Sequence, residues 1–226
     1  MSRGARISVD GLEVKYGSAT VLAGIDLTVS AGECVALMGP SGSGKSTLLA
    51  CITGTQRPSG GRVQVGSHVM SELNTSNRAR IRRTSMGLMF QTPDLLPELS
   101  VEENVALAML FDGVPRNQAL TSARASLEAV GLQQHGGKRV DEVSGGEAQR
   151  IALARALVRP EMDLLIADEP TASLDAANAQ RITKLILSRV RVTGATALLA
   201  THDESVAGAC DRVVRLREPL TVEAQA

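Results

Sequence analysis

Short runs of β-forming residues separated by turns fill the first 35 residues of the chain, in RISVDGLEVKYG and then GIDLTVSAGE. CVALMG (34–39) is a continuous apolar run, which predicts a buried strand. A glycine-rich loop follows it, and then a short helix over 46–53 that ends at Gly54. RVQVG (62–66) alternates as an exposed strand does, and MGLMF (86–90) predicts another buried strand. The chain therefore opens with β-structure around a glycine-rich loop.

The pattern changes to a helical period from about residue 92. Ser100 and Glu103 form a capping box ahead of the helix VEENVALAML, since each side chain can bond to the other residue's backbone N–H. A second helix is predicted over 117–130, and a third begins at SGGE (144–147) and continues through IALARALV. We expect residues 92–160 to form a helical subdomain.

Strands alternate with helices again in the last third of the chain. DLLIAD predicts a buried strand, Asp175 begins a long helix, and ATALLAT, ESVAGA and RVVRLRE follow as strand, helix and strand. Buried strands that alternate with helices indicate a mostly parallel sheet. We expect one domain over 1–217, with an α/β core built from 1–91 and 161–217, and a loose tail over 218–226.

Composition and charge narrow the class of protein. Of the 226 residues, 43% are hydrophobic, which is ordinary for a globular protein. No run approaches the roughly 18 consecutive apolar residues of a membrane span, and MSRGARISVDG lacks the apolar middle of a signal peptide. Lys+Arg and Asp+Glu both number 24, so no basic footprint for nucleic acid stands out. We expect a cytoplasmic protein; if it serves a membrane, the membrane part is another chain.

Three smaller features have local explanations. The basic run RARIRR (78–83) is attributed to a solvated helix face rather than a binding patch. Cys34, Cys51 and Cys210 are few and widely spaced, which favours small buried apolar residues over disulfides or a metal site. The three histidines have no metal-ligand spacing.

The glycine-rich segment GPSGSGKS fits the pattern G-x-x-x-x-G-K-S/T, between a predicted strand and a predicted helix. Successive backbone N–H groups and the helix N-terminus can bind phosphates, which disfavours the alternative of an ordinary glycine–serine turn. Lys45 can reach the β- and γ-phosphates of a nucleotide, and the Ser46 hydroxyl can bind Mg²⁺. The predicted nucleotide-binding residues here are Gly39, Pro40, Ser41, Gly42, Ser43, Gly44, Lys45, Ser46 and Thr47.

Two acids follow the apolar run LLIA. Asp168, at the carboxyl end of that predicted strand, is expected beside the phosphate loop, where it would hold Mg²⁺ through water. Glu169 is one residue further and can polarise an attacking water. An acid pair after a strand is by itself more often the start of a loop, but after a phosphate loop it indicates phosphoryl-transfer chemistry.

The phosphate loop, SGGE and the acid pair, in this order, resemble the ATP-binding cassette ATPases over about residues 5–217. The resemblance implies a P-loop NTPase core with a mostly parallel sheet, an antiparallel β subdomain and an inserted helical subdomain. It implies that the chain binds ATP and Mg²⁺ and hydrolyses the ATP.

The resemblance also implies roles for single residues. Tyr16 would stack on adenine, Gln91 would reach the Mg²⁺ and the attacking water, and His202 would contact the γ-phosphate. Asp175 belongs to a loop that crosses to another subunit. The alternatives are a core aromatic for Tyr16, an ordinary polar loop residue for Gln91, a structural histidine, and a helix N-cap for Asp175. The implied catalytic residues are Glu169, His202, Gln91 and Lys45, and the implied metal-binding residues are Ser46, Gln91 and Asp168.

The segment SGGE has two compatible interpretations. Locally it is a capping box that begins a helix. The resemblance implies that two copies pair head to tail, so that Ser144, Gly145, Gly146 and Glu147 of one contact the γ-phosphate held by the other, and bare glycines allow that approach. Val143 replaces the family's usual leucine here, and Ala148 its usual polar residue.

FQTPDLLPELSVEENV, with SGGE and DEPT, resembles the branch that serves lipoprotein release, macrolide and peptide export, haem export and cell division. The resemblance implies two copies docked on two copies of a membrane permease, at the cytoplasmic side of the membrane, with residues 91–98 lining the docking groove. Leu95, Leu96 and Pro97 are the expected apolar contacts, and packing within the chain is their alternative. The functional alternatives are a soluble cassette protein acting on ribosomes or DNA, a non-hydrolysing regulatory subunit, and a cell-division ATPase that moves no cargo.

Overall fold

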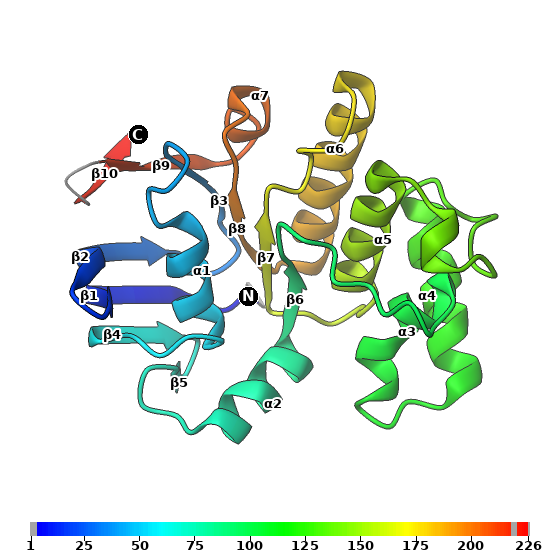
Figure 1. The fold of residues 1–226 in the computed structure, drawn as a ribbon, viewed down its shortest axis with the longest axis horizontal. Coiled ribbons are helices and arrows are strands. Elements are labelled where there is room, and N and C mark those ends of the chain that lie inside the picture. Colours follow the sequence, from blue (N-terminus) through cyan, green and yellow to red (C-terminus); the bar gives the residue numbers. More distant parts are fainter. Residues whose placement is uncertain (1–3, 218–220, 226) are drawn as a thin grey trace.

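A computed structural model describes residues 4–217 and 221–225 of the chain, which form two sheets and the helices around them (Figure 1). The strands are β1 (Ile7–Tyr16), β2 (Ala19–Val29), β3 (Cys34–Met38), β4 (Gly60–Val65), β5 (His68–Val69), β6 (Met86–Met89), β7 (Leu164–Asp168), β8 (Thr196–Ala200), β9 (Arg212–Arg217) and β10 (Thr221–Gln225). The helices are α1 (Lys45–Thr53), α2 (Thr75–Ser85), α3 (Val101–Leu110), α4 (Arg116–Ala129), α5 (Gly145–Leu157), α6 (Ala176–Thr193) and α7 (Glu204–Ala207), with a 3₁₀ turn at Val140–Glu142.

The larger sheet has six strands in the order β10-β9-β3-β8-β7-β6. All of its pairs are parallel except β9 with β10, so the predicted mostly parallel sheet is confirmed. The smaller sheet has the order β2-β1-β4-β5 and is antiparallel throughout, as the family resemblance implied.

The central strands of the larger sheet are buried on both faces, which is why they are continuous apolar runs in the sequence. Successive residues of β7 face opposite cores. Leu164 and Ile166 pack with α1 and the antiparallel sheet, whereas Leu165 and Ala167 pack with α5 and α6. In Figure 1 the antiparallel sheet and the helices α3, α4 and α5 accordingly lie at opposite sides of the larger sheet.

Two details differ from the sequence prediction. The expected loose tail is wrong for 221–225, which form β10 against β9; residues 218–220 and 226 lie outside the described residues. The basic run 78–83 lies on α2 but is only partly solvated. Arg78 is buried, and the Arg82 guanidinium donates to the carbonyls of Thr53 and Gly54 at the end of α1.

The structure also describes the cysteines and the character of the helices. The cysteines are free thiols, with Cys34 and Cys51 buried and Cys210 half-buried. Over the described part of the chain, no helix combines the length and apolar character that crossing a membrane requires.

Candidate functional site

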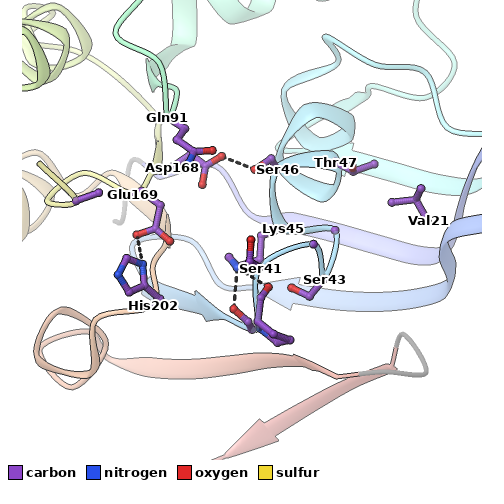
Figure 2. Close-up of a pocket in the computed structure, with 15 residues that line it drawn as sticks. Val21, Ser41, Ser43, Lys45, Ser46, Thr47, Gln91, Asp168, Glu169 and His202 are labelled. Atoms are coloured by element: carbon purple, nitrogen blue, oxygen red, sulfur yellow. Dashed lines mark hydrogen bonds and ion pairs between the residues drawn. The ribbon is translucent and has the colours of Figure 1, made fainter. Parts of the chain in front are cut away.

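A pocket of about 530 Å³ lies at the carboxyl ends of β3, β7 and β8, where parallel α/β sheets place their ligand sites (Figure 2). Its lining combines the glycine-rich loop with side chains from distant segments. The lining residues are Val21, Gly39, Pro40, Ser41, Gly42, Ser43, Gly44, Lys45, Ser46, Thr47, Gln91, Asp168, Glu169, Ala172 and His202. The fold therefore brings together the whole predicted phosphate loop, Gln91, both acids and His202.

The phosphate loop is shaped by glycines in the left-handed region, with φ of 82° at Gly42 and 86° at Gly44. Gly44 is the N-cap of α1 and supplies no side-chain bond to the helix. The first N–H groups of α1 are therefore left for a ligand, and the helix dipole makes an anion the favoured one. A Cβ at Gly44 would lie 2.6 Å from Leu22 Cδ2, so the Leu22 side chain would have to shift to admit one.

The Lys45 ammonium is folded back onto its own loop. Its Nζ donates to the carbonyl oxygens of Gly39 at 2.7 Å and Pro40 at 3.0 Å. An ammonium has three protons, so one remains for a phosphate oxygen while the other two hold the lysine in place. This arrangement puts a positive charge inside the pocket before any ligand arrives.

Oxygen donors gather on the opposite side of the pocket. The Ser46 hydroxyl donates to the Asp168 carboxylate at 2.6 Å, and Gln91 lies beside them (Figure 2). Burial raises the pKa of Asp168, and the bond from Ser46 opposes this. A desolvated carboxylate beside a hydroxyl and an amide is a donor set that suits a hard divalent cation. Among the described residues, no group of three or more His, Cys, Asp or Glu is placed to hold a metal ion.

Glu169 has a strained backbone, with φ of 52°. A non-glycine residue in this region costs energy, and such strain concentrates at functional sites. Its side chain is 11% exposed, and its Oε2 lies 2.9 Å from Nδ1 of His202, whose side chain is 71% exposed. Figure 2 shows the two side chains pointing toward each other at the edge of the pocket. Glu169 and His202 can therefore act on the same reacting group.

The segment SGGE begins α5 with the predicted capping box. The Ser144 hydroxyl accepts from the Glu147 N–H at 3.3 Å, and the Glu147 carboxylate accepts from the Ser144 N–H at 2.7 Å. The bond from the Ser144 backbone N–H is the main cause of the lowered pKa of Glu147. His135 Nε2 lies 3.0 Å from Glu147 Oε1, a contact that the sequence did not suggest.

The two glycines of this segment have different surroundings. A Cβ at Gly146 would lie 3.0 Å from the Ser173 carbonyl oxygen, so close packing within the chain already disfavours a side chain there. A Cβ at Gly145 would meet nothing within 4 Å, and Gly145 and Ser144 are exposed. Neither lines the pocket of its own chain. The bare backbone at Gly145 is therefore free to contact another molecule.

Two further predicted residues also lie outside the pocket lining. Tyr16 is 53% exposed and its hydroxyl donates to Gln56 Oε1, so the alternative of a core aromatic is wrong. Asp175 is the N-cap of α6, where its carboxylate accepts from the Asn178 N–H at 2.9 Å, and this bond lowers its pKa. Its crossing to another subunit stays a prediction, as does the stacking of Tyr16 on adenine.

The sequence analysis missed two lining residues and one buried residue behind the pocket. Val21 and Ala172 line the pocket, and nothing in their sequence context distinguishes them. Gln149 is buried and bonds to the backbone of Glu169 and Ser173. The sequence could have indicated this residue, because it is an amide on the apolar stripe of a predicted helix, where a buried polar group needs specific hydrogen-bond partners.

Comparison with known proteins agrees with this geometry. The sequence profile described as ABC transporter matches residues 22–172, more than half of the chain. The chain is 43% identical over 205 residues to the lipoprotein-releasing system ATP-binding protein LolD 1 of Rhodospirillum rubrum, covering 90% of each. It is 44% identical over 199 residues to LolD of Novosphingobium aromaticivorans, covering 88% of each.

Solved structures of the same fold are also similar. The dimeric ATP-binding cassette MJ0796 in a post-hydrolysis state, bound to ADP and Pi, superimposes with a TM-score of 0.89 at 31% identity and covers 96% of each chain. The predicted α/β fold, the branch of relatives and the binding of ATP are thus confirmed. The chain belongs to the ABC transporter family, as one of that family's ATP-hydrolysing subunits.

Proposed function

We propose that this protein is the ATPase of a membrane transporter of the lipoprotein-releasing class, and that two copies close on ATP to drive a separate permease. One observation carries the proposal: the helix N-terminus at Gly145 is exposed and lies outside its own chain's pocket, which leaves it free to complete the pocket of a second copy. The LolD relatives and the dimeric cassette structures support it, and they do not favour a soluble protein acting on ribosomes or DNA.

The residues of the pocket have different roles in ATP hydrolysis, and the first of these are phosphate binding and metal binding. The loop N–H groups, the N-terminus of α1 and the Lys45 ammonium bind and orient the phosphates. Ser46, Asp168 and Gln91 would hold Mg²⁺ together with phosphate oxygens, and the bound ion would neutralise charge on the phosphates.

Glu169 accepts the proton of the attacking water as general base. His202 Nδ1, at 2.9 Å from that carboxylate, holds it in place, and in the imidazolium form the other ring nitrogen would also donate to the γ-phosphate. The strained backbone of Glu169 keeps the carboxylate at the pocket edge.

The second copy completes the site from the other side. Ser144 and the N–H groups at Gly145 and Gly146 present a helix N-terminus to the γ-phosphate held by the partner. ATP binding then favours the closed pair, and loss of the γ-phosphate on hydrolysis weakens it.

A groove of about 470 Å³ between α2, α3 and the end of α5 is the proposed docking place of the permease. It carries four arginines beside aromatic side chains, so it suits an apolar cytoplasmic helix with acidic residues. Its lining is Ala79, Arg82, Arg83, Met86, Leu88, Phe90, Ala108, Phe111, Arg155, Ala156 and Arg159.

None of the residues 91–98 that were expected to line the docking groove lines this one, but the loop after Gln91 is bonded to it through Arg155. Arg155 donates to the carbonyls of Pro93 at 2.6 Å and Asp94 at 2.9 Å. A displacement of Arg155 in the groove would therefore be transmitted to this loop. Leu95 packs into the core, which supports its packing alternative, whereas Leu96 is 42% exposed and remains an expected permease contact.

A pull-down from native membranes tests the proposal. The bait is the tagged Glu169→Gln chain with Mg-ATP, and the control is the same bait without nucleotide. We expect an ATP-dependent partner with a few membrane spans and a large extracytoplasmic domain. Capture of ribosomes or DNA-repair proteins, or of no membrane protein, would contradict the transporter assignment.

A further inference from the structure

Gln149, on the second turn of α5, connects the helix that begins with SGGE to the strand end that carries Glu169. The residue is 3% exposed, and both ends of its amide are bonded. Its Nε2 donates to the Glu169 carbonyl oxygen at 2.6 Å, and its Oε1 accepts from the Ser173 N–H at 2.9 Å. One side chain thus spans the two ends of the turn that joins β7 to α6.

The orientation of this amide follows from its partners. The reverse orientation would set the amide NH₂ against the Ser173 N–H and the amide oxygen against the Glu169 carbonyl. Both contacts would then be repulsive inside a buried site. A residue that bonds to both groups here therefore needs a donor and an acceptor at fixed separation, as glutamine has.

The bond acts on the backbone unit that holds the strained conformation. Glu169 has a φ of 52°, and such a conformation persists only where the surroundings determine it. The Ala200 carbonyl accepts from the Glu169 N–H at 2.9 Å, and the Glu169 carbonyl accepts from Gln149 Nε2 at 2.6 Å and from the Ala172 N–H at 3.3 Å. The Glu169 carboxylate points toward His202 and the pocket because its backbone is held from both sides.

We infer that Gln149 is a positioning residue for hydrolysis, which holds the Glu169 carboxylate near the reacting phosphate. It also connects Glu169 to α5, the helix whose N-terminus contacts the partner's nucleotide. This inference rests on the proposed roles of Glu169 and of SGGE. It gives a physical link between the two sites of a dimer. The N-terminus of α5 contacts one nucleotide, and Gln149, one turn further, holds the base that acts on the other.

The test is ATP hydrolysis by the purified full-length chain carrying Gln149→Met, which keeps the volume and removes both bonds. A misplacement of about 1 Å far from the chemistry costs on the order of 10²-fold, so we expect a kcat about 10- to 100-fold lower. The KM for ATP and the binding of a fluorescent ATP analogue should stay unchanged. Thr183→Val, which removes another buried side-chain bond to backbone at 2.8 Å on α6, is the control and should leave kcat unchanged.

A double-mutant cycle separates positioning from folding. If Gln149 acts through Glu169, then Gln149→Met should change the residual rate of Glu169→Gln by less than about twofold. A purely structural role would lower the rate by the same factor in both backgrounds and would overturn the inference. A normal kcat in Gln149→Met beside an inactive Glu169→Gln would also overturn it, without touching the proposed function.

Gln149→Asn keeps an amide in the buried site, so it provides a second test of the inference if Gln149→Met does not fold. Because it is one methylene shorter, it cannot reach both partners, and we expect a loss of kcat close to that of Gln149→Met. Full activity in a folded Gln149→Asn would overturn the inference. Hydrolysis at the wild-type rate by Glu169→Gln would overturn both the inference and the assignment of the base.

Discussion

The Ser46 hydroxyl donates a 2.6 Å hydrogen bond to the carboxylate of Asp168, 122 residues further along the chain. The bond joins the first turn of α1 to the end of β7, so the phosphate loop and the acid strand meet at one point. The carboxylate is partly desolvated there, and burial raises its pKa above the ordinary 3.8. This pair therefore sets the charge and the hydrogen bonding at that point of the pocket.

The apo protein should lose stability as pH rises through the titration of Asp168. Because its pKa is raised in the folded state, the folded state binds more protons than the unfolded state between the ordinary 3.8 and the raised value. Asp168→Asn should therefore melt above the wild type at about pH 8, with the advantage shrinking toward about pH 4. Thermal unfolding without nucleotide or metal measures this, and an advantage independent of pH would contradict it.

Adding MgCl₂ in excess to the same two chains with ATP bound should reverse the order of their melting temperatures. A cation that binds only the folded protein raises its melting temperature, and the neutral amide of Asp168→Asn removes the charged ligand. We expect Mg²⁺ to stabilise the wild type and to leave Asp168→Asn nearly unchanged. Equal shifts in both would remove Asp168 from the proposed metal site.

Glu169→Gln should bind ATP with wild-type affinity and hydrolyse it about 10²- to 10⁴-fold more slowly, the range of general-base catalysis. The isosteric amide can still bond to His202, so the pocket should stay intact. Light scattering with Mg-ATP should find a stable dimer in this variant and a transient one in the wild type. Turnover equal to the wild type would exclude Glu169 as the base.

Gly145→Asp should fold as well as the wild type and lose ATP-driven dimerisation. Nothing within 4 Å blocks a side chain there, and a carboxylate favours a helix N-terminus in the isolated chain. The same carboxylate would repel the partner's γ-phosphate. Gly145→Ala is the size control and should keep at least partial activity.

Mixing two inactive variants tests the head-to-tail arrangement. Lys45→Ala breaks the phosphate side of a site, and Gly145→Asp breaks the other side. In a mixed dimer one site has both defects and the other has neither, so an equal mixture should recover about a quarter of wild-type activity. Each site formed within one chain would instead give no recovery.

Leu96→Glu should leave basal ATP hydrolysis unchanged and abolish its stimulation by the permease in reconstituted vesicles. Leu96 is 42% exposed, so the charge is tolerated in the isolated chain but unfavourable against an apolar helix. Val192→Glu is the control, because Val192 is 82% exposed and lies on α6 rather than on the loop after Gln91. Loss of nucleotide binding in Leu96→Glu would point to a folding role.

The features that the sequence determined by itself are those formed by neighbouring residues. The capping boxes at Ser100 and Ser144 and the left-handed turns at Gly42 and Gly44 depend on groups a few positions apart. Such short-range bonds and turns form independently of the tertiary packing, because their partners are already adjacent in the sequence. The phosphate loop, the helix starts and the buried strands could therefore be predicted directly.

The tertiary structure decided the contacts between distant residues. Arg78 is buried although its basic run predicts a solvated helix face, and the apolar stripe on which Gln149 lies suggests its burial without naming its partners. The bonds from Gln149 to Glu169 and Ser173 exist because α5 packs beside the turn after β7. The exposure of Gly145 and the different constraint on Gly146 follow from the same packing. Contacts of this kind depend on how the elements pack in three dimensions, which the order of residues along one helix does not specify.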